Sequence, residues 1–219
     1  MAVLTLGTGL RLWGIKHGLP YVYNVDEDAN FVRTAIFFFS GDYDPHYFIN
    51  PPAFSYLLHG VLALWYGGGW PFGSGDAASE AYAIHPTEVF VLARVTSAVL
   101  GAATVPFVYA TGVRLYDRRV GLIAAALMAV SFLPVFYSHL ALNDAPALFA
   151  LMLSVYGSAG VLVHGRLRDY LIAGGGLGLA VATKYTAGIV ILPLAAAALA
   201  DLVRSRPRQL PKLGGLKPV

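Results

Sequence analysis

The sequence predicts an all-α, polytopic membrane protein, and three observations favour this fold class. Of its 219 residues, 57% are hydrophobic and only 12% are charged, whereas soluble domains carry about 25% charged residues. Several apolar runs reach or approach the roughly 20 residues that a membrane-spanning helix requires. The basic residues are concentrated between and after these runs. The composition excludes a soluble domain and a disordered chain, and it disfavours a membrane β-barrel, whose strands alternate polar and apolar residues.

The first predicted element is a membrane helix over residues 1–15, which is short or truncated. Arg11 interrupts its apolar run, and the segment has neither a basic start nor a clear small-residue cleavage site, so it does not fit a secretory signal peptide. Arg11 and Lys16 fit poorly with a helix that runs from inside to outside. Cysteine is absent, which excludes disulfides, cysteine-based zinc sites and thiol nucleophiles.

Residues 16–88 are expected to form a large outer loop. They contain eight acidic residues but only two basic ones, Lys16 and Arg33. Their many Tyr, Phe and Trp side chains are typical of a membrane interface. Within the loop, residues 53–66 are apolar but too few to cross a bilayer, so a juxtamembrane helix along the outer surface is predicted. The two prolines before this run suit the start of a helix.

Three later runs are each predicted to cross the membrane once. They cover residues 89–112, 120–142 and 145–163, and basic clusters follow the first run at 114–119 and the third at 164–169. Both clusters should be cytoplasmic, because basic residues are enriched in cytoplasmic loops. The turn between the second and third runs then faces outward.

Residues 171–200 are too long for one span, and we expect two helices, 171–183 and 186–200, with a turn at Lys184. This arrangement keeps the basic segment 201–219 as a cytoplasmic loop and places Lys184 at the outer face. Ten of the fifteen Lys and Arg residues then lie in cytoplasmic segments, as topology requires. The sequence therefore predicts a multi-pass protein of the plasma (inner) membrane with its active site facing outside.

The run Asp26, Glu27, Asp28 is the first candidate for chemistry. Three consecutive acids repel each other and gain nothing from packing, so one alternative is a solvated loop. The other is a catalytic carboxylate or a ligand set for a divalent cation, formed by Asp26 and Asp28. If a helix begins at residue 24, Asp26 or Asp28 could cap it, and Arg33 could balance the charge.

Asp144 and Lys184 are isolated charges within long apolar stretches. Asp144 is predicted as an N-cap before Ala145 and Pro146 or as a functional acid near the membrane, and the two interpretations are compatible because a cap can also point its carboxylate into a cavity. Lys184 either extends to the interface or binds an anion, most plausibly a phosphate. The turn at Lys184 would bring it to the same side as Asp26 and Asp144, which favours the functional interpretation.

Other polar residues give weaker signals. His46 could donate to a phosphate or act as an acid or base, although a lone loop histidine is more often structural. Arg94 is expected to extend to the bilayer edge. The spacing of His46, His59 and His139 does not support a zinc site. The glycines at 174–178 do not follow a strand, so helix packing is favoured over nucleotide binding.

Several segments resemble one known family, the phospholipid-carrier-dependent glycosyltransferases of the protein mannosyltransferase and aminoarabinose transferase superfamily (glycosyltransferase family 39-like, GT-C fold). The residues that carry this resemblance lie in the same order along the chain. They are GLPYVYNVDE (18–27), GDYDPHYF (41–48), NPP (50–52), ARVTS (93–97), RLYDRR (114–119), YSHLALNDAP (137–146) and ATKYT (182–186).

The resemblance implies a GT-C helical bundle and an inverting sugar transfer. A hexose or pentose on a polyprenyl-phosphate lipid would pass to a hydroxyl of a lipid, glycan or protein acceptor. Asp26 would be the general base, with Glu27 beside it, and Asp144 would orient the acceptor or a partner cation. The lipid phosphate would bind at one cluster of polar side chains, formed by Lys184, Arg33, His46 and Tyr185.

Three further expectations follow from the resemblance. The family is regarded as metal-independent, but Asp26 and Asp28 form the acidic pattern that some GT-C enzymes use for a divalent cation, so a cation is left open. Members have more membrane helices, so the chain is expected to be the N-terminal portion of a longer enzyme, whose remaining helices would complete the lipid groove. Membrane lipids are expected partners, and nucleic acid is not.

Two alternatives remain at the level of the sequence. A transporter or lipid flippase could use Asp144 and Lys184 as a coupling pair within the membrane. A non-catalytic GT-C-like scaffold could keep the fold without the reaction. The concentration of acids in an outer loop, rather than at the bilayer midplane, favours the transferase.

Overall fold

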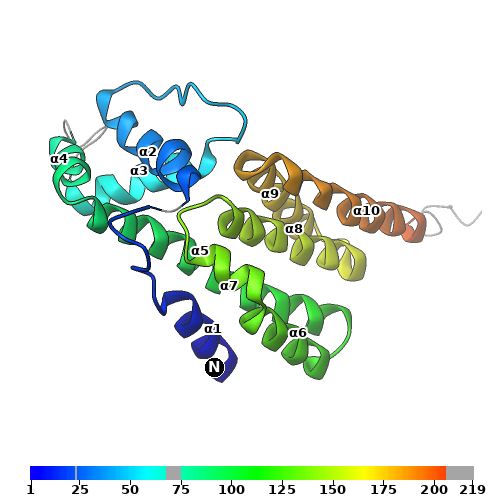
Figure 1. Cartoon of the computed structure of the whole chain (residues 1–219). Helices are drawn as coiled ribbons and strands as arrows, with labels where there is room; N and C mark the ends of the chain where they lie inside the picture. Colours follow the sequence, from blue (N-terminus) through cyan, green and yellow to red (C-terminus); the bar gives the residue numbers. More distant parts are fainter. Residues whose placement is uncertain (23, 68–74, 206–219) are drawn as a thin grey trace, which may run out of the picture.

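A computed structural model describes residues 1–22, 24–67 and 75–205, and these residues are helical with no β-strand (Figure 1). Of the predicted cytoplasmic loop 201–219, the part from residue 206 onward lies outside the described residues, whereas residues 201–205 continue a helix. The long helices form a bundle, and a second group of shorter helices covers one end of it (Figure 1).

The bundle is built around two central helices. α5 contacts α1, α6, α7 and α8, and α8 also contacts α9 and α10. Their bounds are α1 (Ala2–Leu12), α5 (Pro86–Leu115), α6 (Arg118–Val130), α7 (Phe132–Ser138), α8 (Asp144–His164), α9 (Leu167–Thr183) and α10 (Ile191–Ser205).

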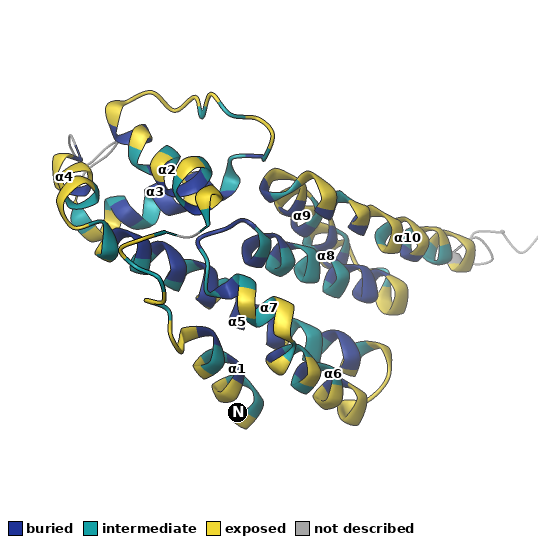
Figure 2. Cartoon of the chain, viewed as in Figure 1, coloured by how far each residue is buried: buried dark blue, intermediate teal, exposed yellow. Residues whose placement is uncertain are grey.

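Among the residues that the structure describes, three helical segments are long and apolar enough to cross a membrane. They are α5, α8 and the stretch Tyr185–Arg204, and the bent pair of α6 and α7 can supply a fourth. Many large apolar residues on these helices are exposed, as expected for surfaces that face lipid, and Figure 2 shows exposed positions along the helices. The predicted class of all-α, polytopic membrane protein is thus confirmed.

The second predicted span, residues 120–142, is not one helix. α6 ends at Val130, Ser131 is extended with ψ 131°, and α7 continues at an angle of 53°. Pro134 contributes to the break, because it has no backbone N–H and its ring would clash with the carbonyl four residues earlier. The two halves still lead from one end of the bundle to the other.

Close packing of α8 against α9 depends on glycine. A Cβ added to Gly176 would lie 2.4 Å from the backbone nitrogen of Ser154, and one added to Gly157 would lie 2.3 Å from that of Ala173. Gly174, Gly175 and Gly178 meet nothing within 4 Å. Of the glycine run that suggested helix packing, Gly176 therefore makes the close contact.

The shorter helices define what we call the loop end of the molecule, which comprises residues 13–22, 24–67 and 75–85 with the adjoining helix termini. The region predicted as a loop is largely helical, and α3 occupies the range expected for the juxtamembrane helix. Its elements are a π-helix η1 (Glu27–Val32), α2 (Arg33–Phe37), a 3₁₀ turn η2 (Phe38–Ser40), α3 (Ala53–Tyr66) and α4 (Asp76–Ile84). They share an apolar core with the start of α5, which includes Phe31, Phe54, Leu58, Leu62, Val89 and Phe90.

The opposite end of the bundle carries basic residues, and we call it the arginine end. Arg114 at the C-terminal end of α5 stacks over the Tyr156 ring at 3.9 Å and lies 3.3 Å from the buried Asp169. The arginines at positions 118, 119, 166 and 168 are also at helix termini of this end. The two ends therefore differ in charge as the sequence predicted.

Candidate active site

Asp26 is an exposed carboxylate at the start of the π-helix η1. Its backbone N–H donates to the Asn24 side chain at 3.0 Å, and its carboxylate accepts a hydrogen bond from Asn30 at 2.8 Å. π-Helical turns occur often at functional sites. Because its side chain is open to solvent, Asp26 is accessible to an incoming hydroxyl group.

Glu27, the next residue, lies in a very different environment. Its side chain is fully buried and forms two hydrogen bonds with Arg94, at 2.6 and 2.8 Å. It also accepts the backbone N–H of Ala141 at 2.8 Å. Both carboxylate oxygens are already engaged, so this geometry gives Glu27 a positioning role and does not support the catalytic role expected beside Asp26.

Arg94 does not extend to the bilayer edge, and that prediction is wrong. Only 3% of its side chain is exposed. Besides binding Glu27, it donates to the carbonyls of Ile15 and His17 at 3.0 and 2.8 Å. The pair therefore joins four segments: the chain after α1, the start of η1, α5, and the turn before α8.

Asp28 and Arg33 form a second ion pair on the same turn of chain. Their closest oxygen and nitrogen atoms are 2.5 Å apart, and the Tyr82 hydroxyl donates to the other Asp28 oxygen. Burial, and then this hydrogen bond, raises the pKa of Tyr82. Asp28 and Tyr82 also line a pocket of about 540 Å³ between η1 and the α4–α5 junction.

The acidic run does not form a metal site. Within the described parts of the chain, no group of three or more His, Asp or Glu side chains is placed to hold a metal ion. Asp26 instead accepts from Asn30, and Asp28 is bound by Arg33 and Tyr82. The two carboxylates of the acidic run therefore each have their own protein partners, and in the described residues His46, His59 and His139 are not gathered in one such group.

Asp144 and Lys184 form the third pair, at 2.6 Å. Asp144 is the first residue of α8, and the N-cap of this helix is Asn143. The interpretation of Asp144 as the N-cap is therefore wrong. Lys184 occupies the extended turn between α9 and the 3₁₀ helix η3 (Tyr185–Val190). Both side chains are about one-third exposed or less, 27% and 33%. The pair therefore lies where α8 begins and α9 has just ended.

Three asparagines, Asn143, Asn50 and Asn30, lie between the Asp144 region and Asp26. Asn143 donates to the carbonyl of Thr183 at 2.8 Å and to the side chain of Asn50 at 3.3 Å. Asn50 and Asn30 line the same shallow depression, and Asn30 donates to Asp26. The fold thus brings Asp26, Asp144 and Lys184 to one region of the loop end.

Tyr185 belongs to this region as well. Its exposed phenol donates to the carbonyl of Phe48 at 3.3 Å, so residues 41–52 cross above the ends of α8 and α9. Asp144 also opens into an apolar pocket of about 200 Å³ between α7 and α8, whose lining is Leu133, Pro134, Tyr137, Ala145 and Leu148. The polar pair of Asp144 and Lys184 therefore lies beside this apolar pocket, which we call the apolar groove between α7 and α8.

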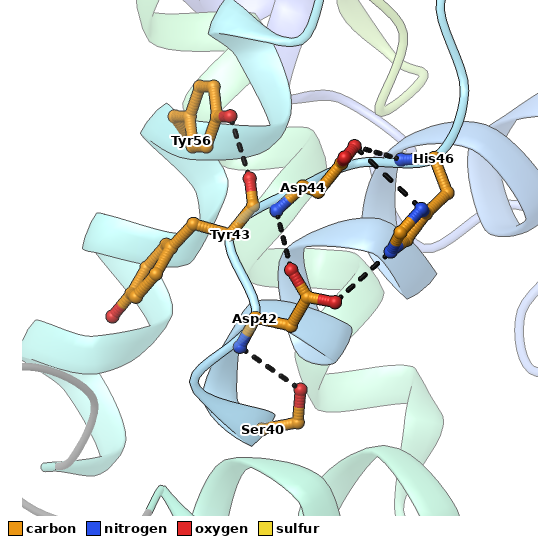
Figure 3. A network of polar contacts seen from close by, with 6 residues as sticks. All are labelled: Ser40, Asp42, Tyr43, Asp44, His46 and Tyr56. Atoms are coloured by element: carbon orange, nitrogen blue, oxygen red, sulfur yellow. Dashed lines mark hydrogen bonds and ion pairs between the residues drawn. The ribbon is translucent and has the colours of Figure 1, made fainter.

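His46 lies on the same crossing segment but faces other partners (Figure 3). Its Nε2 atom is 3.1 Å from Asp42, and its Nδ1 atom is 3.8 Å from Asp44. The hydrogen bond with Asp42, and then the charge of Asp44, raises the pKa of His46. In the described structure no hydrogen bond or ion pair joins His46 to Asp26 or Lys184, so His46 organises its own turn.

Sequence reasoning missed two residues that assemble the site. Asn50 and Asn143 connect the crossing segment to the helix termini, yet uncharged amides in loops give no distinctive signal. Arg94 did carry a signal in the sequence, because it is the only charged residue between Val89 and Gly112. Lys184 is likewise the only charged residue in the run 171–200.

Fold and site define a helical membrane protein with carboxylates and a lysine gathered at one end. Residues 82–216, more than half of the chain, match the family described as dolichyl-phosphate-mannose-protein mannosyltransferase. The chain belongs to this family, which makes it a membrane glycosyltransferase of the GT-C type, and the resemblance is confirmed. No curated protein and no solved structure matches the chain. The matched region contains Asp144 and Lys184, whereas Asp26 precedes it.

Proposed function

We propose that this glycosyltransferase moves a sugar from a polyprenyl-phosphate carrier to the hydroxyl group of an acceptor at the loop end. The observation that carries the proposal is the convergence of exposed Asp26 with the Asp144–Lys184 pair. The family description, which names dolichyl-phosphate-mannose, supports the choice of a lipid-phosphate carrier. The site supplies an exposed carboxylate, Asp26, and a partly exposed cation, Lys184, which suit the proton acceptor and the phosphate-binding group of such a transfer.

Asp26 is proposed as the general base. It takes the proton of the acceptor hydroxyl while that oxygen attacks the anomeric carbon, and the bond from this carbon to the phosphate oxygen breaks. The proton ends on Asp26, and the electron pair leaves with the lipid phosphate. A single displacement from the opposite face inverts the anomeric configuration.

Lys184 is proposed to stabilise the charge that develops on the leaving phosphate. Its ammonium group now binds Asp144, and it would share or exchange this partner as the phosphate arrives. Asp144 is then free to orient the acceptor. Tyr185 is next to Lys184 in the sequence and is proposed to donate a further hydrogen bond to the phosphate. Arg33 and His46 would first have to leave their carboxylate partners, Asp28 and Asp42, before they could bind it.

The loop end is proposed to face the outside of the plasma membrane. The basic clusters lie at the arginine end, and basic residues are retained on the cytoplasmic side. The apolar groove between α7 and α8 opens beside Asp144, so a prenyl chain lying in the bilayer could present its phosphate to Lys184.

Replacing Asp26 by Asn in the full-length protein tests this function. Transfer from a purified polyprenyl-phosphate sugar should fall by about 10²–10⁴-fold, the usual contribution of a general base, because the amide cannot accept the proton. Binding of the lipid donor should be unchanged. Glu80→Gln is the matched control, since Glu80 is an exposed acid on α4 outside the site. Full transfer activity in Asp26→Asn would refute the assignment.

A further inference from the structure

A second groove lies at the loop end, apart from the proposed active site. It has a volume of about 460 Å³ and runs between the end of α3 and the first turns of α5, which contact each other (Figure 1). Its lining is Lys16, Trp65, Thr87, Glu88, Val91, Leu92 and Val95. None of these side chains belongs to the site around Asp26 and Lys184.

The wall of this groove is apolar and continues along a membrane-spanning helix. Val91 and Val95 are one helical turn apart on α5, and Leu92 lies beside them. Val99, one turn further, is 57% exposed, so the apolar surface extends beyond the groove. An extended hydrocarbon chain can lie along such a surface.

The rim of the groove carries groups that suit a membrane interface. Trp65 is 71% exposed at the end of α3, and tryptophan is enriched at the level of lipid headgroups. The neighbouring Tyr66 hydroxyl is buried with no hydrogen-bond partner in the described structure. Burial, and then the charge of Glu88, raises the pKa of Tyr66, which places Glu88 close to it.

Lys16 and Glu88 give the rim one positive and one negative charge. Both residues are exposed, and among the described residues neither side chain forms a hydrogen bond or an ion pair. The formal charge of the lining is therefore zero. Such a rim matches a dipolar headgroup better than an anionic one, whose excess negative charge Glu88 would repel.

We propose that this groove binds a zwitterionic phospholipid whose headgroup ends in a primary ammonium. Its phosphate contacts Lys16, its ammonium donates to Glu88, and one acyl chain lies along Val91 and Val95. A primary ammonium makes charge-assisted hydrogen bonds with a carboxylate, which a quaternary ammonium cannot make. The lipid fills the junction of α3 with α5 and so stabilises the attachment of the loop end to the bundle.

Lipid retention by the delipidated full-length protein tests the proposal. Native mass spectrometry would follow an equimolar mixture of phosphatidylethanolamine, phosphatidylcholine and phosphatidylglycerol with identical acyl chains. Phosphatidylethanolamine should be retained about tenfold over both other lipids, the discrimination that one charge-assisted hydrogen bond gives. Equal retention of the three lipids, or equal retention of phosphatidylethanolamine and phosphatidylcholine, would overturn the proposal. This retention experiment uses the wild-type protein and requires no variant.

Two substitutions then assign the contacts. Glu88→Gln should abolish the preference for phosphatidylethanolamine over phosphatidylglycerol, and Lys16→Gln should weaken retention of all three lipids. Glu80→Gln and Arg118→Gln are matched controls at exposed positions outside the groove and should retain the wild-type preference. An unchanged preference in Glu88→Gln, with a wild-type melting temperature, would show that the lipid binds elsewhere.

Discussion

Glu27 and Arg94 form an ion pair that is almost wholly removed from solvent. Desolvating two charges costs several kcal/mol for each ion, and only good geometry with further hydrogen bonds offsets that cost. Here the guanidinium binds both carboxylate oxygens and two carbonyls, while Ala141 donates to the carboxylate. Glu27 follows Asp26 directly, and Ala141 lies in the turn that leads to Asp144. The ion pair therefore fixes the backbone next to Asp26 and this turn.

Glu27→Gln is therefore expected to destabilise the protein by about 3–5 kcal/mol, because the buried charge of Arg94 loses its counter-charge. Thermal unfolding of the purified protein in detergent measures the effect. The double variant Glu27→Gln with Arg94→Gln should recover part of the loss, since no unpaired charge remains. A melting temperature equal to that of wild type in the single variant would contradict a structural role for this pair.

His46 should titrate at a higher pH than a free histidine. Its raised pKa depends first on Asp42, whose own pKa is lowered by the backbone N–H of Asp44 and by His46. A raised histidine pKa gives stability that is complete below about pH 6.5, the ordinary value, and is lost as pH rises through the folded pKa. Because the pKa of Asp42 is lowered, its carboxylate keeps its charge to a lower pH than an ordinary aspartate, and the interaction is lost as pH falls through that lowered pKa.

A histidine NMR titration of the isotope-labelled protein tests this expectation. The His46 resonance should report a pKa above that of a model peptide, and Asp42→Asn should return it toward the ordinary value. Asp76→Asn serves as a control acid on α4, outside the turn. If Asp42→Asn leaves the His46 titration unmoved, the turn drawn in Figure 3 is not the cause.

The break between α6 and α7 explains why Arg11 lies within the short helix α1. α6 ends at Val130, so its last carbonyls lack the helical donors that would follow. Arg11 on α1 is fully buried and donates to the carbonyls of Ala129 and Met128 at 3.0 and 3.1 Å. The poor fit of Arg11 to the charge rule is thereby explained, because it binds a broken helix rather than a membrane surface.

Arg11→Met should destabilise the α6–α7 segment, by about 1–3 kcal/mol for each carbonyl that loses its partner. Hydrogen exchange of the α6–α7 amides measures this locally, and exchange there should rise more than in α9. Arg166→Met, an exposed position at the arginine end outside α6 and α7, should leave exchange in the α6–α7 segment unchanged. Wild-type protection in Arg11→Met would mean that the break is stable without the guanidinium.

Across the whole molecule, acidic residues gather at the loop end and basic residues at the arginine end. The chain has no cysteine, so single cysteines report the two ends without background. In intact cells a membrane-impermeant maleimide should label Glu80→Cys but not Arg118→Cys, which should react only after permeabilisation. The reverse pattern would place the loop end in the cytoplasm and exclude an outward-facing site.

The sequence predicted much of the fold because its signals are local. Apolar runs and the basic clusters between them indicated a helical membrane bundle, and Lys184 marked the turn between α9 and η3. The α6–α7 break was missed, since Pro134 alone does not decide whether a membrane helix bends or ends. Of the site, Asp26, Asp144 and Lys184 were selected as isolated or adjacent charges, whereas Asn50 and Asn143 were not.

The sequence by itself determined that the chain is a membrane helix bundle, which end is acidic, and which few charges stand out. Tertiary structure alone decided which of these charges are engaged. Glu27 and Arg94 are 67 residues apart, and Arg11 and Ala129 are 118 apart. Hydropathy and charge are read from neighbouring residues, but burial and pairing depend on segments that meet only when the chain folds. That is why Glu27 became a buried support while the adjacent Asp26 remained open to solvent.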